Sequence, residues 1–274
     1  MDVLVTPEWL AVNKKSLNVV VVHVLFNGPA SKTNTNAALQ IPGSRVLDLK
    51  NEFSDTSSPF PGTFPTKIDF NAQVRALGIS NNSTVVVYDI DGVYASPRVW
   101  WMFKTMGHEN IMILQGGLPA WQHAGYATEA LQKYNFPQGN FKALKAQPAV
   151  KTYDFVKENY SNPNIQLIDA RSAGRFLGTA PEPRAELQSG HIPNSINIPY
   201  TSVLANGGFA PITELTELFA AYPLKNKILV FSCGSGVTAA VVLCAAAMVL
   251  PNEMYIYDGS WTEWATKEKL FSDS

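Results

Sequence analysis

The stretch KILVFSCGSGVTAAV, residues 227–241, decides the fold. It opens with a run of Ile, Leu, Val and Phe that is typical of a buried strand, turns at two glycines, and continues with an Ala- and Val-rich pattern typical of a helix. The same order occurs earlier, where TVVVY at residues 84–88 precedes Gly92 and a second helical pattern. A strand, a glycine turn and a helix that recur in one chain indicate a duplicated α/β unit.

Two further pairs of landmarks support the duplication. IPGS at Ile41–Ser44 recurs as IPNS at Ile192–Ser195, and GGLPAW at Gly116–Trp121 has its counterpart in GSWTEW at Gly259–Trp264. The pairs stand in the same order in the two halves. The chain of 274 residues is also long enough for two domains. We therefore predict two copies of one α/β domain in tandem.

Strands and helices alternate within each copy. Short runs rich in Val, Ile and Leu predict strands over Val19–Leu25, Ile165–Asp169 and Ile228–Phe231. Apolar residues at helical spacing predict helices over Phe70–Leu77 and Thr213–Ala221. This alternation predicts, in each domain, a mostly parallel sheet with helices on both faces.

The stretch from Ala127 to Val150 breaks the alternation and contains Pro137 and Pro148, so it reads as a linker. We place the domain boundary near residue 145. The N-terminal domain then covers residues 1–145, including the linker from about 127, and the C-terminal domain covers residues 146–274.

Composition excludes several classes of function. Lys plus Arg is 21 and Asp plus Glu is 22, so the net charge is −1 and the chain lacks the basic footprint of a nucleic-acid-binding protein. No polybasic run favours a membrane surface, and the longest apolar run, Val237–Leu250, is shorter than the about 20 residues of a membrane-spanning helix. The N-terminus also lacks a secretory signal. We therefore expect a cytoplasmic protein without membrane or nucleic-acid partners.

Cys233 and Cys244 are the only cysteines. If the residues between them are mostly helical, they lie roughly 16 Å apart, whereas a disulfide requires Cα atoms within about 7 Å. We predict two free thiols, which fit a reducing compartment such as the cytoplasm. The scattered Cys and His residues lack metal-ligand spacing. Position 239 is Ala, so the third glycine of a dinucleotide fingerprint is missing, and we expect no cofactor.

Cys233 is the candidate catalytic residue. It lies between a predicted strand and a predicted helix, in a glycine-containing loop that can turn successive N–H groups toward one point and so form an anion cradle. A cysteine in this setting ionises more readily than an ordinary thiol, and the thiolate is the nucleophile. We expect its sulfur to be reachable from solvent. The alternative is a small buried hydrophobe, the role we assign to Cys244 in mid-helix.

The first copy provides an internal control. Aligning Gly92-Val93 with Gly236-Val237 places Asp89 opposite Cys233. A carboxylate does not accept a sulfur atom, so we expect only the C-terminal copy to be catalytic.

The sequence resembles the tandem rhodanese-like sulfurtransferases, specifically their 3-mercaptopyruvate branch, over nearly the whole chain. The active loop of that family reads Cys-Gly-Ser-Gly-Val-Thr, and Cys233–Thr238 match it at every position. Thiosulfate-preferring relatives usually carry basic residues directly after the cysteine, where this chain has Gly234 and Ser235. The persulfide loop implied by the resemblance consists of Gly234, Ser235, Gly236, Val237 and Thr238. Further matches are Ser96–Trp101, Gly190–Pro193 and Tyr257–Trp261.

The resemblance implies a small 2-oxo acid bearing a thiol as sulfur donor, with its carboxylate held by two arginines. These belong to a Gly-Arg-Phe and a Glu-Pro-Arg element, which correspond to Arg175 and Arg184. Guanidinium groups bind carboxylates in bidentate fashion, although the two residues could instead form ordinary salt bridges of a surface loop.

The resemblance also implies a two-stage mechanism. Cys233 takes the sulfur as a persulfide, and a thiophilic acceptor (cyanide, thioredoxin or a small thiol) then removes it, with help from the Ser235 and Thr238 hydroxyls.

The match fails at one position. Family members often carry a histidine shortly after a Ser-Asp-x-x-Ser-Pro stretch, where it joins a proton-handling triad. Here that stretch is Ser54–Pro59, and the expected histidine falls at Gly62. None of the four histidines replaces it, so either water supplies the proton or the preferred sulfur donor differs from the usual one.

Other functions stay open. A thiosulfate sulfurtransferase has the same reactive residue. A Cys-dependent phosphatase needs an arginine six positions after the cysteine, where this chain has Ala239. A non-enzymatic sulfur relay or scaffold module would explain the missing histidine, but not the retained loop and both arginines.

Overall fold

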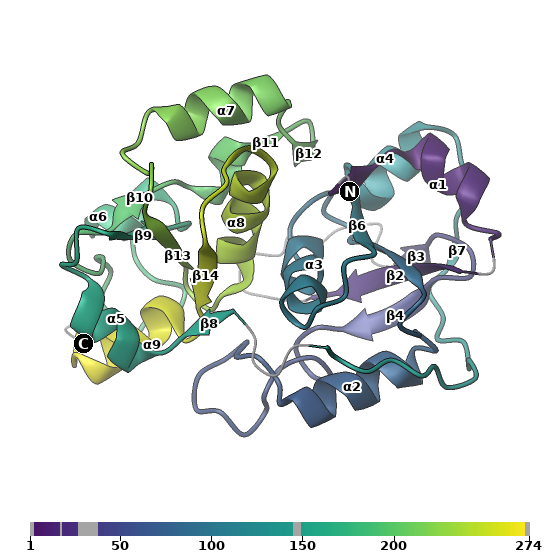
Figure 1. The fold of residues 1–274 in the computed structure, drawn as a ribbon, viewed down its shortest axis with the longest axis horizontal. Coiled ribbons are helices and arrows are strands. Elements are labelled where there is room, and N and C mark those ends of the chain that lie inside the picture. Colours follow the sequence, from purple (N-terminus) through teal and green to yellow (C-terminus); the bar gives the residue numbers. More distant parts are fainter. Residues whose placement is uncertain (1–2, 17, 27–37, 145–148, 272–274) are drawn as a thin grey trace. The chain divides into compact units, whose positions relative to one another are not determined.

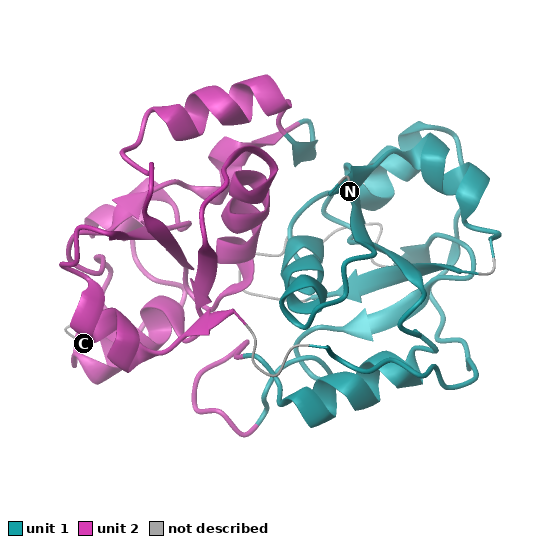
Figure 2. Ribbon diagram, viewed as in Figure 1, with its two compact units in different colours: residues 1–56, 64–148, 206–209 teal, residues 57–63, 149–205, 210–274 magenta. Residues whose placement is uncertain are grey.

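The computed structural model describes residues 3–16, 18–26, 38–144 and 149–271 (Figure 1). They form two compact units (Figure 2). Unit 1 comprises residues 1–56, 64–148 and 206–209, and unit 2 comprises residues 57–63, 149–205 and 210–274. Each unit thus includes a short segment from the other half of the sequence. The predicted boundary at residue 145 lies outside the described residues.

Unit 1 is built on a parallel sheet in the order β1-β6-β5-β2-β4. Its strands are β1 (Leu4–Val5), β2 (Val19–Leu25), β4 (Arg45–Asp48), β5 (Thr84–Tyr88) and β6 (Ile111–Leu114), and a separate antiparallel pair is formed by β3 (Leu39–Gln40) and β7 (Glu129–Ala130). The helices are α1 (Pro7–Asn13), α2 (Lys67–Ala76), α3 (Ser96–Thr105) and α4 (Gly117–His123).

Unit 2 is built on a second parallel sheet in the order β10-β9-β13-β14-β8. Its strands are β8 (Val150–Lys151), β9 (Ile165–Asp169), β10 (Ile196–Asn197), β13 (Ile228–Ser232) and β14 (Met254–Tyr257). The helices are α5 (Tyr153–Asn159), α6 (Ala173–Leu177), α7 (Ile212–Ala220), α8 (Val237–Val249) and α9 (Ser260–Lys267). Between α6 and α7 the chain also forms β10, the 3₁₀ helix η2 (Tyr200–Val203), β11 (Leu204–Ala205) and β12 (Gly208–Phe209).

The two sheets have the same strand order. Matching β1 with β8, β6 with β14, β5 with β13, β2 with β9 and β4 with β10 superposes one order on the other. The predicted duplication and the α/β class are therefore confirmed. The predicted strands over Val19–Leu25 and Ile165–Asp169 agree with β2 and β9, and the third runs one residue further, to Ser232.

Helices cover both faces of each sheet (Figure 1). In unit 1, Leu10 of α1 and Trp121 of α4 pack with Val86 of β5 in one apolar cluster. Successive strand residues point to opposite faces, so Val85 and Val87 point to the other face, where α2 and α3 lie. The sheet is therefore buried on both faces, which explains why its strands read as continuous apolar runs.

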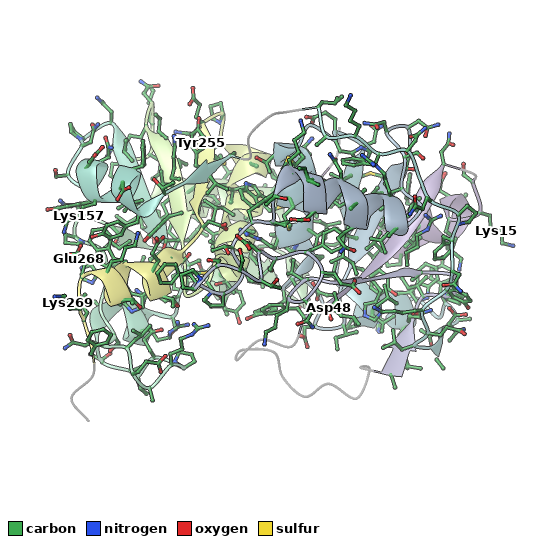
Figure 3. All side chains as sticks on the ribbon, turned by 90° about the horizontal axis from the view of Figure 1, so that it is seen from below. Lys15, Asp48, Lys157, Tyr255, Glu268 and Lys269 are labelled. Atoms are coloured by element: carbon green, nitrogen blue, oxygen red, sulfur yellow. The ribbon has the colours of Figure 1, made fainter. Side chains whose placement is uncertain are left out.

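The corresponding arrangement holds in unit 2. Val156 of α5 and Trp261 of α9 belong to one cluster with Val230 of β13. At the surface, Lys157 of α5 and Glu268, directly after α9, form an ion pair of 2.7 Å that ties the two helices together (both are labelled in Figure 3).

Helix α8 accounts for the longest apolar run in the chain. It packs against β13 and β14, and most of its residues are buried. Cys244 lies on it, fully buried, and burial raises the pKa of its thiol well above the ordinary value. Both cysteines are free. Cys244 is therefore a core residue, as predicted. Within the described ranges, no helix is long and apolar enough to span a bilayer.

We expect His23 to make the stability of unit 1 pH-dependent. Its ring is buried in β2, stacked on Tyr88 at 4.9 Å, and neither ring nitrogen has a hydrogen-bond partner in the described part of the chain. Burial lowers the pKa of His23 from 6.5 to about 4. Between these two pKa values the unfolded state is protonated at His23 and the folded state is not. The free energy of unfolding therefore decreases as the pH falls from about 6.5 to about 4, by at most about 3 kcal/mol.

The His23→Phe variant keeps the stacked ring and has no titratable group, so it should lose this dependence. The measurement is the urea concentration at which unit 1 unfolds in the intact protein, at about pH 7 and about pH 4.5. Pulsed hydrogen exchange in peptides from β2 and β5 reports this unfolding. An equal decline in the wild type and the variant would contradict the assignment.

Candidate active site

The cysteine loop begins where β13 ends. Cys233 follows Ser232, and the chain turns through Gly234, Ser235 and Gly236 before α8 starts at Val237. Gly236 has a φ of 83°, a left-handed conformation that favours glycine. Its N–H donates to the Cys233 Sγ at 3.1 Å. The sulfur thus lies within the first turn of backbone that leads into a helix N-terminus, where partial positive charge accumulates.

Four further amides of this loop have no acceptor. The N–H groups of Gly234, Ser235, Val237 and Thr238 make no hydrogen bond to any described residue. Two of them belong to the first turn of α8, whose N–H groups have no partner inside the helix. A loop of donors around one sulfur suits a second, negatively charged sulfur attached to it.

Unit 1 fills the equivalent loop with its own side chain. Asp89 follows β5 as Cys233 follows β13, and its Oδ2 accepts N–H bonds from Tyr94, Ala95 and Ser96 at 3.1, 2.9 and 2.8 Å. The Asp89 carboxylate thus serves as the acceptor for backbone N–H groups at the start of α3. The two copies therefore share an anion cradle, and only the second combines it with a nucleophile.

The expectation of an open sulfur is wrong for this structure. Cys233 exposes only 2% of its surface. Burial in a dry environment strengthens the hydrogen bond from Gly236.

Residues at the start of α9 hold the loop by hydrogen bonds to its backbone. The Ser260 hydroxyl accepts the Cys233 N–H at 3.2 Å, and the Trp261 N–H donates to the Cys233 carbonyl at 2.9 Å. Thr262 binds the Gly234 carbonyl twice, through its N–H at 3.2 Å and its hydroxyl at 2.7 Å. The carbonyls of Cys233 and Gly234 are therefore both tied to the start of α9.

Arg184 reaches the loop through Thr262. Its Nη1 donates to the Thr262 Oγ1 at 3.0 Å, and that hydroxyl donates to the Gly234 carbonyl. Arg184 is half-buried, so the rest of its guanidinium can meet a ligand beside the loop.

Arg175 lies against the same glycine from α6. Its Nη2 is 3.0 Å from the position a Cβ would take on Gly234, so a side chain at that position would push the guanidinium away by a few tenths of an ångström. Glu182 fixes its guanidinium with bonds of 3.0 Å to Nε and 2.5 Å to Nη2. The two predicted arginines thus converge on Gly234, directly after the cysteine.

A buried arginine anchors this arrangement. Arg171 is fully buried, binds both carboxylate oxygens of Asp169, and donates to Glu182 at 2.7 Å and to the Gly190 carbonyl at 2.6 Å. Its guanidinium also lies over the Trp261 ring at 4.4 Å. Glu182 therefore bridges a buried arginine and the half-buried Arg175.

Comparison with known proteins decides the family. The family model described as Rhodanese-like domain matches residues 7–124 and 152–267. The chain belongs to the rhodanese-like family.

Curated relatives of this rhodanese-like chain cover most of its length. It is 38% identical to the 3-mercaptopyruvate sulfurtransferase of Mus musculus, over 85% of this chain and 80% of that one. It is 37% identical to the thiosulfate sulfurtransferase of Bos taurus, over 95% and 91%. The crystal structure of SseA from Escherichia coli, a 3-mercaptopyruvate sulfotransferase, matches with a TM-score of 0.84 at 33% identity, over 95% of this chain and 99% of that one.

Gly62, where the rhodanese-like family often has a histidine, lies against the loop. It belongs to the segment 57–63 that groups with unit 2, and a Cβ built on it would meet the Ser235 carbonyl at 2.7 Å. Its φ is 75°, which a side chain rarely adopts. A histidine at this position would require a shift of the backbone.

The predicted helpers differ in their surroundings. Ser235 and Thr238 are half-buried at the start of α8, and neither hydroxyl bonds to a described residue, so both remain available to a ligand. His191 is structural, because its Nδ1 lies 2.8 Å from the Phe176 carbonyl and its ring stacks on Phe176 at 4.1 Å. Within the described residues, no cluster of His, Cys, Asp and Glu could hold a metal.

Sequence reasoning missed the supports of the loop. Ser260 and Thr262 lie in the repeated GSWTEW landmark, which could have marked them. Glu182 lies between the two prolines of the arginine motif. For Asp169 and Arg171 the only signal was a charged pair at the end of a buried strand.

Proposed function

We propose that this protein is a sulfurtransferase that takes a sulfur atom from 3-mercaptopyruvate onto Cys233 and passes it to a thiophilic acceptor. The observation that carries this proposal is the cysteine loop itself: the Gly236 N–H donates to the Cys233 sulfur, and the neighbouring loop amides have no acceptor among the described residues. The names of the mouse relative and of SseA support the donor. Uncharged Gly234 and Ser235 after the cysteine also favour it over thiosulfate.

The first step moves a sulfur atom and leaves pyruvate. The Cys233 thiolate attacks the donor's thiol sulfur, an S–S bond forms, and the donor's C–S bond breaks with its electron pair staying on carbon. The resulting pyruvate enolate takes a proton from water or from a loop hydroxyl. Arg175 and Arg184 hold the donor's carboxylate beside Gly234.

The second step regenerates the enzyme. The loop amides of Gly234, Ser235, Val237 and Thr238 stabilise the negative terminal sulfur of the persulfide while it waits. An acceptor such as cyanide, a small thiol or thioredoxin then attacks that sulfur, and the S–S bond breaks with its electrons returning to Cys233.

A thiosulfate sulfurtransferase is the second candidate, because the bovine relative carries that name. Initial rates with 3-mercaptopyruvate and with thiosulfate, each with cyanide as acceptor, separate the two. We expect a higher kcat/KM for 3-mercaptopyruvate and parallel reciprocal plots, the sign of a ping-pong mechanism. A higher value with thiosulfate would reverse the assignment of the donor.

Arg184→Ala should raise the KM for 3-mercaptopyruvate about 10- to 100-fold, because one charge-assisted bond to the carboxylate is worth about 1.5–3 kcal/mol. The kcat should change much less. Steady-state kinetics with both donors provide the check. An equal loss with thiosulfate, which has no carboxylate, would make Arg184 a structural residue of the loop.

We also propose a cytoplasmic location. Two free cysteines, one of them catalytic, support a reducing compartment. The two rhodanese-like domains are assigned to residues 1–145 and 146–274, with the catalytic machinery in the second.

A further inference from the structure

A pocket of unit 2 lies at the opposite end of β13 from Cys233. The pocket has a volume of about 570 Å³, within the range of about 300–1,000 Å³ typical of ligand sites. It lies in a groove between the α7–β13 turn and the α8–β14 turn. We call this groove the open groove. Its lining includes Phe219, Tyr222, Leu224, Leu250, Pro251 and Asn252. Five strand residues, or about 16 Å, separate it from the catalytic cysteine.

The same groove in unit 1 is filled by the chain itself. There the α2–β5 and α3–β6 turns form the walls, and residues 136–144 run between them. The Phe141 N–H donates to the Ile79 carbonyl at 3.3 Å, and the Leu144 N–H donates to the Met106 carbonyl at 2.9 Å. The duplicated fold thus shows what such a groove accepts, namely an extended segment bonded through its backbone.

Phe141 is the anchor of that segment. It is 1% exposed, and its ring lies 5.9 Å from Phe70, 5.8 Å from Phe103 and 5.6 Å from His108. Full burial of a phenylalanine side chain contributes about 1.5–3 kcal/mol. In the unit 1 groove, an aromatic side chain therefore makes a large contribution to holding the segment in place.

The open groove keeps the matching acceptors. Pro223 lies three residues after α7 as Ile79 lies three after α2, and Leu250 caps α8 as Met106 caps α3. Neither the Pro223 nor the Leu250 carbonyl receives a hydrogen bond from the described residues. The two carbonyls of unit 2 that correspond to the acceptors in unit 1 are therefore available to an extended segment.

The charge of the open groove differs from that of its counterpart. In unit 1, Asn81 binds the backbone of Lys142, the residue after the anchor, through bonds of 2.9 and 2.8 Å. The position equivalent to Asn81 is Lys225, which is exposed and has no ion pair with a described residue. Lys227 lies two residues on, and Glu253 on the facing wall bonds the Tyr255 hydroxyl. The rim beside the anchor position therefore carries two lysines against one glutamate, a net positive charge.

We propose that the open groove binds an extended segment of a partner protein, which places an aromatic side chain in the pocket and an acidic residue directly after it. The segment bonds to the Pro223 and Leu250 carbonyls and its carboxylate pairs with Lys225. The site is separate from Cys233, so a bound partner leaves the persulfide loop in place.

A labelled peptide tests the proposal on the full chain. The probe has the sequence of residues 135–144 with Glu in place of Lys142, and its control carries Ala in place of Phe141. Fluorescence anisotropy should give a dissociation constant of about 10–100 µM for the probe. Binding of the control should be at least about tenfold weaker.

Two surface variants locate the binding site. Ala220→Trp fills the pocket from an exposed helix end and should weaken binding at least about tenfold. Lys225→Glu should weaken it about threefold to tenfold. Both variants should keep the wild-type rate of sulfur transfer, so this test stands apart from the test of the proposed function.

Three outcomes would overturn the proposal. The first is no saturation up to about 1 mM peptide. The second is equal binding by the wild type and Ala220→Trp, which would place the peptide elsewhere. The third is a doubling of molecular mass with concentration that Ala220→Trp abolishes, which would make a second copy of the chain the occupant.

Discussion

The Cys233→Ser variant should lose sulfur transfer by at least about 10³-fold with either donor, because a serine oxygen cannot carry the sulfane sulfur between donor and acceptor. The variant should remain folded. Serine fits the space, and its oxygen can accept the N–H of Gly236 that now meets the sulfur at 3.1 Å. Initial rates with cyanide as acceptor, together with the thermal midpoint, provide the measurement.

Cys244→Ala is the matched control. This thiol is fully buried on α8, and burial raises its pKa, so it takes no part in the reaction. The control should keep nearly full activity and lose stability by about 1 kcal/mol for the missing sulfur atom. Turnover by Cys233→Ser comparable to the wild type, or loss of turnover by Cys244→Ala, would assign the chemistry to another residue.

The Arg171→Leu variant should destabilise unit 2 by about 3–5 kcal/mol, because it leaves the carboxylates of Asp169 and Glu182 buried without their shared partner. Arg171 is 0% exposed at its side chain, and it binds both groups. Loss of activity should accompany the loss of stability, since Glu182 also fixes Arg175. The measurement is chemical denaturation of the intact protein, with the unfolding of unit 2 followed by hydrogen exchange in peptides from β9 and β13.

An exposed ion pair offers the contrast. Lys157 pairs with Glu268 at the surface, where its side chain is 45% exposed. Lys157→Ala should cost no more than about 1 kcal/mol, because solvent screens such pairs. Similar losses for the two variants would mean that the Arg171 network contributes little beyond a surface salt bridge.

Much of the architecture could be predicted from local patterns. Strands β2 and β9 were predicted at their full lengths, because strands covered on both faces read as uninterrupted apolar runs. The duplication followed from landmarks such as IPGS and IPNS, and the sheets share one strand order. Both features are visible in the order of residues alone, as an apolar run or as a repeated motif.

The support of the site could not be predicted in the same way. Ser260 and Thr262 act through backbone groups of Cys233 and Gly234, and such bonds depend on where α9 begins relative to the loop. The burial of Cys233 likewise depends on tertiary packing. The placement of Gly62 against Ser235 brings a segment of the first half onto the unit that holds the loop, and no local pattern indicates it.

Cys233 should carry the sulfur atom between the two steps. This can be measured by peptide mass analysis after incubation with 3-mercaptopyruvate in the absence of an acceptor. We expect the added mass of one sulfur on the peptide containing Cys233, release of one pyruvate for each sulfur gained, and loss of that mass when cyanide is added. An unmodified Cys233 peptide accompanied by pyruvate release, or sulfur found on Cys244 instead, would assign the sulfur to another residue.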